Sequence, residues 1–189
     1  MSKKTPGLFF ALIITTLFFT VSANAQDKSE NTLRKIFKLV PAEYFSIYCC
    51  DENPDEFIKK YVTVEDTATG YMQGADTEED PQYSSFQMKL FKRSDGSYIV
   101  GFHSESMRWS DYYFLDYRNG KLKNISLTIP QYSTENIYEF PRNGTVIKVY
   151  KKKYDLPGEP LGVDNSVTKG KKLYDLVWAN GKFTVKKKK

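Results

Sequence analysis

Two adjacent cysteines, Cys49 and Cys50, precede a run of acids and amides in the segment IYCCDENPDEF. Thiolates and carboxylates both ligate metals, but zinc sites usually place about two to four residues between successive cysteines. Neighbouring Cα atoms lie only ~3.8 Å apart, below the ~4.4–6.8 Å usual in disulfides, so a bridge within the pair would be strained. We therefore interpret one or both cysteines first as small buried hydrophobic side chains, with a strained disulfide or an intermolecular bridge as alternatives.

The acids behind the cysteines have a simpler explanation than metal binding. Asn53 suits the N-cap of a helix and Pro54 its first position. Asp55 and Glu56 would then lie in the first turn, where the helix dipole favours negative charge. The segment therefore predicts a short helix, and we expect no metal ion there.

His103, the one histidine of the chain, is the natural candidate for acid–base catalysis. Ser104 and Ser106 follow it, but no Gly-x-Ser-x-Gly turn surrounds either serine. On a strand the His103 side chain would point away from that of Phe102. We expect a solvated or hydrogen-bonded strand histidine, and we predict that the protein functions without it.

A second acidic cluster lies in the segment GADTEEDPQY, at residues 76–80. Hard oxygen ligands of this kind can hold Ca²⁺, but their spacing does not match a calcium-binding loop, so we interpret the segment as a plain acidic loop. The chain also has no phosphate-binding Gly-rich loop and no dinucleotide-binding fingerprint. We therefore assign no catalytic, cofactor-binding or metal-binding residue, and no cofactor.

Residues 1–25 have the pattern of a cleaved signal peptide: a basic start, an apolar run and the motif Ala-Asn-Ala before Gln26. The apolar run is shorter than the ~20 residues that span a bilayer, which makes a retained membrane anchor the weaker alternative. We expect a secreted or periplasmic protein whose mature chain, residues 26–189, forms a single globular domain.

The charge of this mature chain is uneven along its length. Residues 26–110 carry 10 Lys or Arg against 15 Asp or Glu, whereas residues 111–189 carry 16 against 8. The basic half could bind an anionic glycan, a lipid headgroup or an envelope protein, although solvated lysines on strand surfaces explain it more simply. We expect no nucleic acid partner for an exported protein, and no membrane span in the mature chain.

Residues 26–61 have the pattern of a helical lead-in. Four apolar residues, Leu33, Ile36, Phe37 and Val40, recur at the spacing of one helix face. Pro41 then ends this helix. With the helix that begins at Asn53, the lead-in should contain two short helices.

From residue 62 onward, alternating apolar and polar residues are interrupted by turn pairs that supply the positive φ of tight hairpins. The turn pairs are Asp95-Gly96, Asn119-Gly120, Asn143-Gly144 and Asn180-Gly181. They recur at intervals of 24, 24 and 37 residues, and the longest interval contains a Pro- and Gly-rich insertion at residues 155–170. This insertion suits a surface loop, in which Gly170 should tolerate alanine.

We therefore predict a mainly β fold, an antiparallel meander of about eight strands over residues 62–189 behind two short helices. Such a sheet usually buries one face, and the lysines of VYKKKY suit a solvated face or an edge. The number of strands does not distinguish an open or sandwiched sheet from an up-and-down barrel, so both remain alternatives.

Three stretches, KLVPAEYF, FLDYRNGKLKNIS and GKKLYDLVWANGKF, resemble parts of small secreted bacterial β-rich proteins of no assigned activity. The resemblance covers most of the mature chain and supplies no catalytic residue. Export, aromatic-rich strands and basic hairpins together favour a non-catalytic binding or interaction protein. One alternative is a carboxylate-based hydrolase of an envelope or extracellular polymer, and another is a barrel that carries a small ligand.

Overall fold

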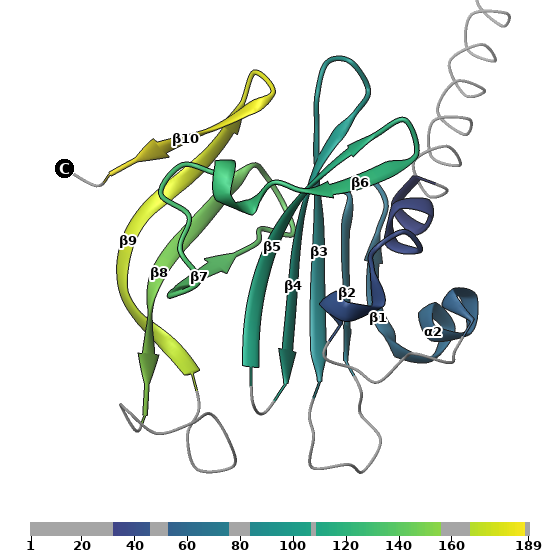
Figure 1. Cartoon of the computed structure of the whole chain (residues 1–189), viewed down its shortest axis with the longest axis horizontal. Coiled ribbons are helices and arrows are strands. Elements are labelled where there is room, and N and C mark those ends of the chain that lie inside the picture. The colour runs from purple at the N-terminus through teal and green to yellow at the C-terminus, as the bar shows by residue number, and fades with distance from the viewer. Residues whose placement is uncertain (1–31, 46–52, 76–83, 107–108, 156–166, 188–189) are drawn as a thin grey trace, which may run out of the picture.

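Ten strands pair in chain order into two antiparallel sheets within the part of the chain that the computed structural model describes (Figure 1). That part comprises residues 32–45, 53–75, 84–106, 109–155 and 167–187. The strands of the first sheet, sheet A, are β1 (Val62–Asp66), β2 (Tyr71–Ala75), β3 (Ser85–Lys92), β4 (Tyr98–Ser106), β5 (Trp109–Arg118) and β6 (Lys121–Asn124). The strands of the second, sheet B, are β7 (Asn136–Glu139), β8 (Val146–Tyr154), β9 (Val167–Ala179) and β10 (Lys182–Lys186).

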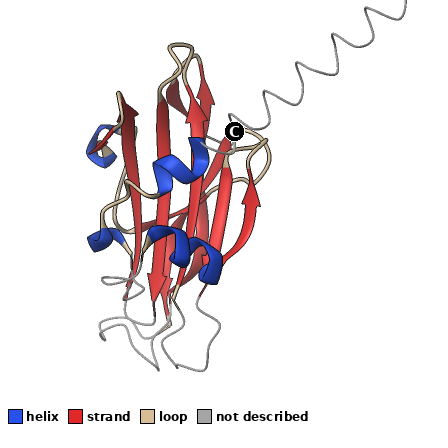
Figure 2. Cartoon of the chain, turned by 90° about the vertical axis from the view of Figure 1, so that its right-hand side faces the viewer, coloured by secondary structure: helices blue, strands red, loops and turns tan. Residues whose placement is uncertain are grey.

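Short helical segments cover one face of sheet A, and sheet B covers the other (Figures 1 and 2). The helical segments on the first face are residues 32–37, η1 (Ala42–Tyr44) and α2 (Pro54–Tyr61). A further turn of helix, η2 (Ser126–Thr128), lies between the last strand of sheet A and the first strand of sheet B. The described chain therefore has three layers: helices, sheet A and sheet B.

Both helices predicted from the sequence are confirmed. The side-chain oxygen of Asn53 accepts a hydrogen bond from the backbone N–H of Asp55 at 2.9 Å, and Pro54 opens helix α2. Leu33 and Ile36, from the predicted apolar stripe, are fully buried against sheet A. None of the helices in the described ranges is long and apolar enough to cross a membrane.

Sheet A buries both of its faces, whereas the sequence predicted one buried and one solvated face. Alternation along β4 directs Val100 and Phe102 toward the helices and Ile99 toward sheet B. One apolar cluster therefore joins the helices to sheet A, and a second joins the two sheets. The face of sheet A that meets sheet B is called its inner face below.

The meander prediction is correct in strand order, and two sheets packed on one another correspond to its sandwiched alternative. The described strands number ten, against about eight predicted. Each sheet ends in two edge strands, so the barrel alternative is wrong. Strand β8 pairs with β9 and, over residues 148–151, also with β7, so Lys151 is not on an edge strand. Lys151 and Lys153 are exposed, as the alternative of a solvated face predicted. Strand β9 begins at Val167, which makes the predicted loop over residues 155–170 too long; residues 156–166 lie outside the described part.

The segment after β7 crosses the inner face of sheet A and ties the two sheets together. The Phe140 ring lies against Gly101 so closely that a Cβ on that glycine would come within 2.5 Å of it. The buried ammonium group of Lys89 donates hydrogen bonds to two backbone carbonyls, one of which belongs to Arg142, at 3.0 Å. Arg142 also forms an ion pair with Asp66 of β1 at 3.2 Å. These contacts anchor sheet B to strands β1, β3 and β4.

Two of the predicted hairpin turns have the expected tight geometry. Asn119-Gly120 and Asn180-Gly181 are two-residue turns in which Asn has a φ of 51° and Gly a φ of 75°. Asp95-Gly96 and Asn143-Gly144 lie in longer connections, because five residues separate β3 from β4 and six separate β7 from β8. The sequence therefore located all four connections but predicted the turn type correctly for two.

Gly181→Val is expected to lower the free energy of unfolding by about 1–3 kcal/mol, because a β-branched side chain fits poorly at positive φ. Lys182→Val, at an exposed position in β10, is the control, since valine suits a strand. Denaturant unfolding of both variants beside the parent measures the effect, and equal midpoints for Gly181→Val and the parent would contradict it. Gly170 is unsuitable as a control: it lies in β9, where a Cβ would come within 2.9 Å of the Lys151 carbonyl oxygen, so its predicted loop setting is wrong.

Candidate functional site

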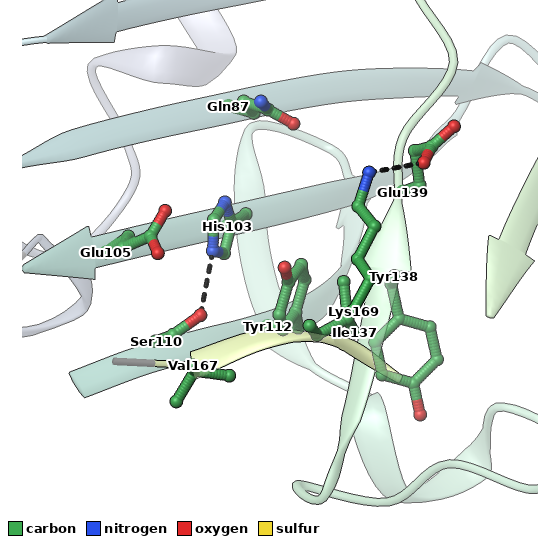
Figure 3. A pocket seen from close by; sticks show the side chains of 10 residues that line it. All are labelled: Gln87, His103, Glu105, Ser110, Tyr112, Ile137, Tyr138, Glu139, Val167 and Lys169. Atoms are coloured by element: carbon green, nitrogen blue, oxygen red, sulfur yellow. Dashed lines mark hydrogen bonds and ion pairs between the residues drawn. The ribbon is translucent and has the colours of Figure 1, made fainter. Parts of the chain in front are cut away.

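A cavity of about 200 Å³ lies between the two sheets, beside strand β7 (Figure 3). It is smaller than the ~300–1,000 Å³ of typical ligand sites, so it suits a small molecule or one unit of a longer one. Most of the side chains around it carry hydrogen-bonding groups. Sheet A contributes Gln87, His103, Glu105, Ser110 and Tyr112, and sheet B contributes Ile137, Tyr138, Glu139, Val167 and Lys169.

Strand register gathers the polar side chains that sheet A contributes. His103 of β4 lies directly between Gln87 of β3 and Tyr112 of β5, and Glu105 lies opposite Ser110. Directly opposite residues share a face of the sheet, with Cβ atoms ~4.5–5.5 Å apart. Farther along the strands, the same face carries the apolar residues of the second cluster. The cavity therefore lies where the inner face of sheet A changes from apolar to polar.

His103 is buried, with 6% of its surface exposed, so the solvated alternative for this residue is wrong and the hydrogen-bonded one is correct. Its Nε2 atom lies 3.2 Å from the Ser110 hydroxyl oxygen, and its ring stacks on Tyr112 at 4.1 Å between centroids. Burial, and to a smaller degree the positive charge of Lys152, lowers the pKa of His103 to about 3. At neutral pH the imidazole is therefore uncharged, and it can both donate and accept one hydrogen bond.

Ser110 was missed by sequence reasoning, which considered only the serines next to His103 in the chain. Ser104 lies on the opposite face of β4, whereas the β4–β5 hairpin returns Ser110 to the side of His103. A serine hydrogen-bonded to histidine resembles a nucleophile and its general base. With a pKa near 3, however, His103 is a weak base that would not hold the serine proton. The pair therefore presents two neutral hydrogen-bonding groups to the cavity.

The two carboxyl groups at the cavity have opposite electrostatic environments. Burial raises the pKa of Glu105, although the positive charge of Lys152 opposes this shift. Hydrogen bonds from Lys169 and Lys148, at 2.5 and 3.1 Å, hold the pKa of Glu139 below its usual value. Glu139 is thus ionised and paired, while Glu105 is easier to protonate than an exposed glutamate.

Lys152 was also missed, because the lysines of VYKKKY were interpreted as solvated or at an edge. Irregular register between Tyr150 and Lys152 turns the Lys152 side chain inward, where its ammonium group donates to the Ser110 carbonyl oxygen at 2.7 Å. Burial lowers the pKa of Lys152. Alternation in the sequence does not reveal where a β-bulge occurs. Beyond the bulge, it therefore predicts the wrong side chains of β8 to face inward.

Ser104 and Ser106, the serines considered from the sequence, do not line this cavity. Cys49, Cys50 and the acidic segment at residues 76–80 lie outside the described residues. Within the described ranges, His, Cys, Asp and Glu side chains form no group of three or more that could hold a metal ion.

Comparison with known proteins finds no family model, no curated protein and no solved structure that matches this chain.

Proposed function

We propose that this protein is exported and binds a small, uncharged, hydroxyl-rich ligand, such as a sugar or the end of a glycan, without catalysis. The observation that carries the proposal is the polar cavity between the sheets. A buried neutral imidazole, an amide, a phenol and a serine hydroxyl converge there from β3, β4 and β5. The proposal thus gives His103 a role in binding, in place of our expectation from the sequence that the protein functions without it. Such groups both donate and accept hydrogen bonds, as sugar hydroxyls do.

The charges at the cavity support an uncharged ligand. Lys169 and Glu139 both line it, and they neutralise each other in an ion pair. A charged ligand would have to compete with this partly exposed ion pair for one of its two partners. Lys148 is paired with the same glutamate. The anionic partner of sheet B that the basic half of the sequence suggested therefore stays a prediction.

The second candidate function is a carboxylate-based hydrolase acting on an extracellular polymer. The opposite pKa shifts of Glu105 and Glu139 favour it, because a protonated and an ionised carboxyl group can act as acid and base. Release of reducing ends from a polysaccharide, abolished by Glu105→Gln while binding persists, would establish this candidate over the first. The alternative of a barrel that carries a small ligand is not supported, because both sheets have free edges and do not close into a barrel.

Neutral monosaccharides are expected to bind in preference to sugar acids and amino sugars when all three classes are screened by ligand-observed NMR. Gln87→Ala should weaken binding by about two- to tenfold, since a lost hydrogen bond contributes about 0.5–1.5 kcal/mol. Gln131→Ala is the matched control, because Gln131 is exposed and does not line the cavity. Tighter binding of the charged sugars, or no binding of any, would contradict the proposal.

Export is tested separately from binding. The basic start, apolar run and Ala-Asn-Ala motif of residues 1–25 support cleavage before Gln26. We expect the intact mass of the exported protein to correspond to a chain that begins at Gln26. A mass that retains residues 1–25 would instead mean that this segment anchors the protein.

A further inference from the structure

The polar side chains of the cavity belong to a longer row that continues across sheet A. Gln73 of β2 pairs directly with Gln87 of β3, Gln87 with His103 of β4, and His103 with Tyr112 of β5. All four side chains therefore share the inner face. The row crosses three inter-strand spacings of ~4.8 Å, a distance of about 14 Å. Only the part from Gln87 to Tyr112 lines the cavity.

The neighbouring row on the same face is covered, whereas this one is partly open. Tyr71, Lys89 and Gly101 are buried beneath the segment that crosses sheet A after β7. Gln73 and Gln87, one row farther along, keep intermediate exposure. The polar row therefore runs beside the crossing segment, from the cavity toward β2.

The outer end of the row is held in place. The Tyr71 hydroxyl donates a hydrogen bond to the side-chain oxygen of Gln73 at 2.8 Å. This contact fixes the amide plane of Gln73 and leaves its NH₂ group to donate elsewhere. An amide that is oriented in advance loses less conformational entropy when it binds a ligand.

We infer that the ligand is an extended chain, a linear neutral oligosaccharide whose end unit occupies the cavity and whose following units lie along Gln87 and Gln73. The inference rests on the proposed function and adds the length and direction of the ligand. The cavity accommodates one small unit, and the row provides amide groups for the units that follow it. A ligand that lies across the strands meets a new hydrogen-bonding side chain at each inter-strand step.

The experiment is a length series measured by isothermal titration calorimetry on the mature protein. The probes are glucose with its α-1,4- and β-1,4-linked oligomers, and N-acetylglucosamine with its β-1,4-linked oligomers, each from one to five units. For one of these series, affinity should rise by about tenfold between the monomer and the trimer and then level off. Gln73→Ala should remove most of that rise and leave the affinity for the monomer unchanged.

The ratio of trimer to monomer affinity within one variant is the deciding quantity, because any loss of folded protein lowers both affinities equally. Monomer binding without a rise along the series would overturn the extended ligand and leave the proposed function standing. A rise that survives in Gln73→Ala would also overturn the inference, since the chain would then lie elsewhere. Absence of binding by every probe would overturn both proposals.

Discussion

Gly101→Ala is expected to lower the free energy of unfolding by about 3 kcal/mol, near the upper end of what overpacking a core usually costs. The new methyl group would lie 2.5 Å from a ring carbon of Phe140, far inside van der Waals contact. Gly101 is in the middle of β4, which is paired on both sides, so the backbone cannot move away without breaking sheet A. The ring must therefore move, and with it the segment that ties the sheets together.

Phe140→Leu supplies the control for this prediction, because a smaller side chain leaves room for the added methyl group. In a double-mutant cycle, Gly101→Ala should cost markedly less in the Phe140→Leu background than in the parent. Urea unfolding of the four proteins gives the coupling free energy. Additive costs would mean that the ring does not limit this position.

The second large effect is acid sensitivity caused by His103. Its folded-state pKa of about 3 lies below the ordinary value of 6.5, so between these pH values the unfolded chain binds more protons than the folded one. Stability must therefore fall as the pH is lowered through this window, by up to about 1.4 kcal/mol per pH unit. Burial of Glu105 acts in the opposite direction, because its raised pKa favours the folded state in acid.

His103→Gln isolates the histidine, since glutamine keeps a hydrogen-bonding group but does not titrate. Urea unfolding of both proteins between pH 4 and pH 7 should show a steeper loss of stability in the parent, and the difference in slope measures His103 alone. An NMR titration provides the second readout. An imidazole signal that titrates near pH 6.5 in the folded protein would contradict the prediction.

Much of the fold could be predicted because its signals are local. The cap at Asn53, the apolar stripe that includes Leu33 and the glycine turns at Gly120 and Gly181 depend on a few neighbouring residues. The division into two sheets could not be predicted in this way. Two consecutive strands of a meander have the same sequence pattern whether they pair with each other or belong to different sheets. The change from sheet A to sheet B falls at residues 125–135, where the sequence has no alternation.

The candidate site depends on contacts between residues that are distant in sequence, which explains why most of it was missed. His103 was recognised by its residue type, but its burial follows from a second sheet that the sequence did not reveal. Ser110 reaches it through the register of one hairpin, and Lys152 through a bulge. If the register of β3, β4 and β5 had been derived from the turns that connect them, the sequence would have placed Gln87 opposite His103.

The crossing segment has a consequence for how the protein folds. Each sheet joins strands that follow one another in the chain, so each can form from local hairpins with little loop-closure entropy. Contacts between the sheets span far longer separations, 53 residues from Lys89 to Arg142 and 86 from Lys92 to Trp178. We expect the two sheets to form first and to dock last. The cavity exists only after docking, so a bound ligand would stabilise the assembled pair of sheets over the separate ones.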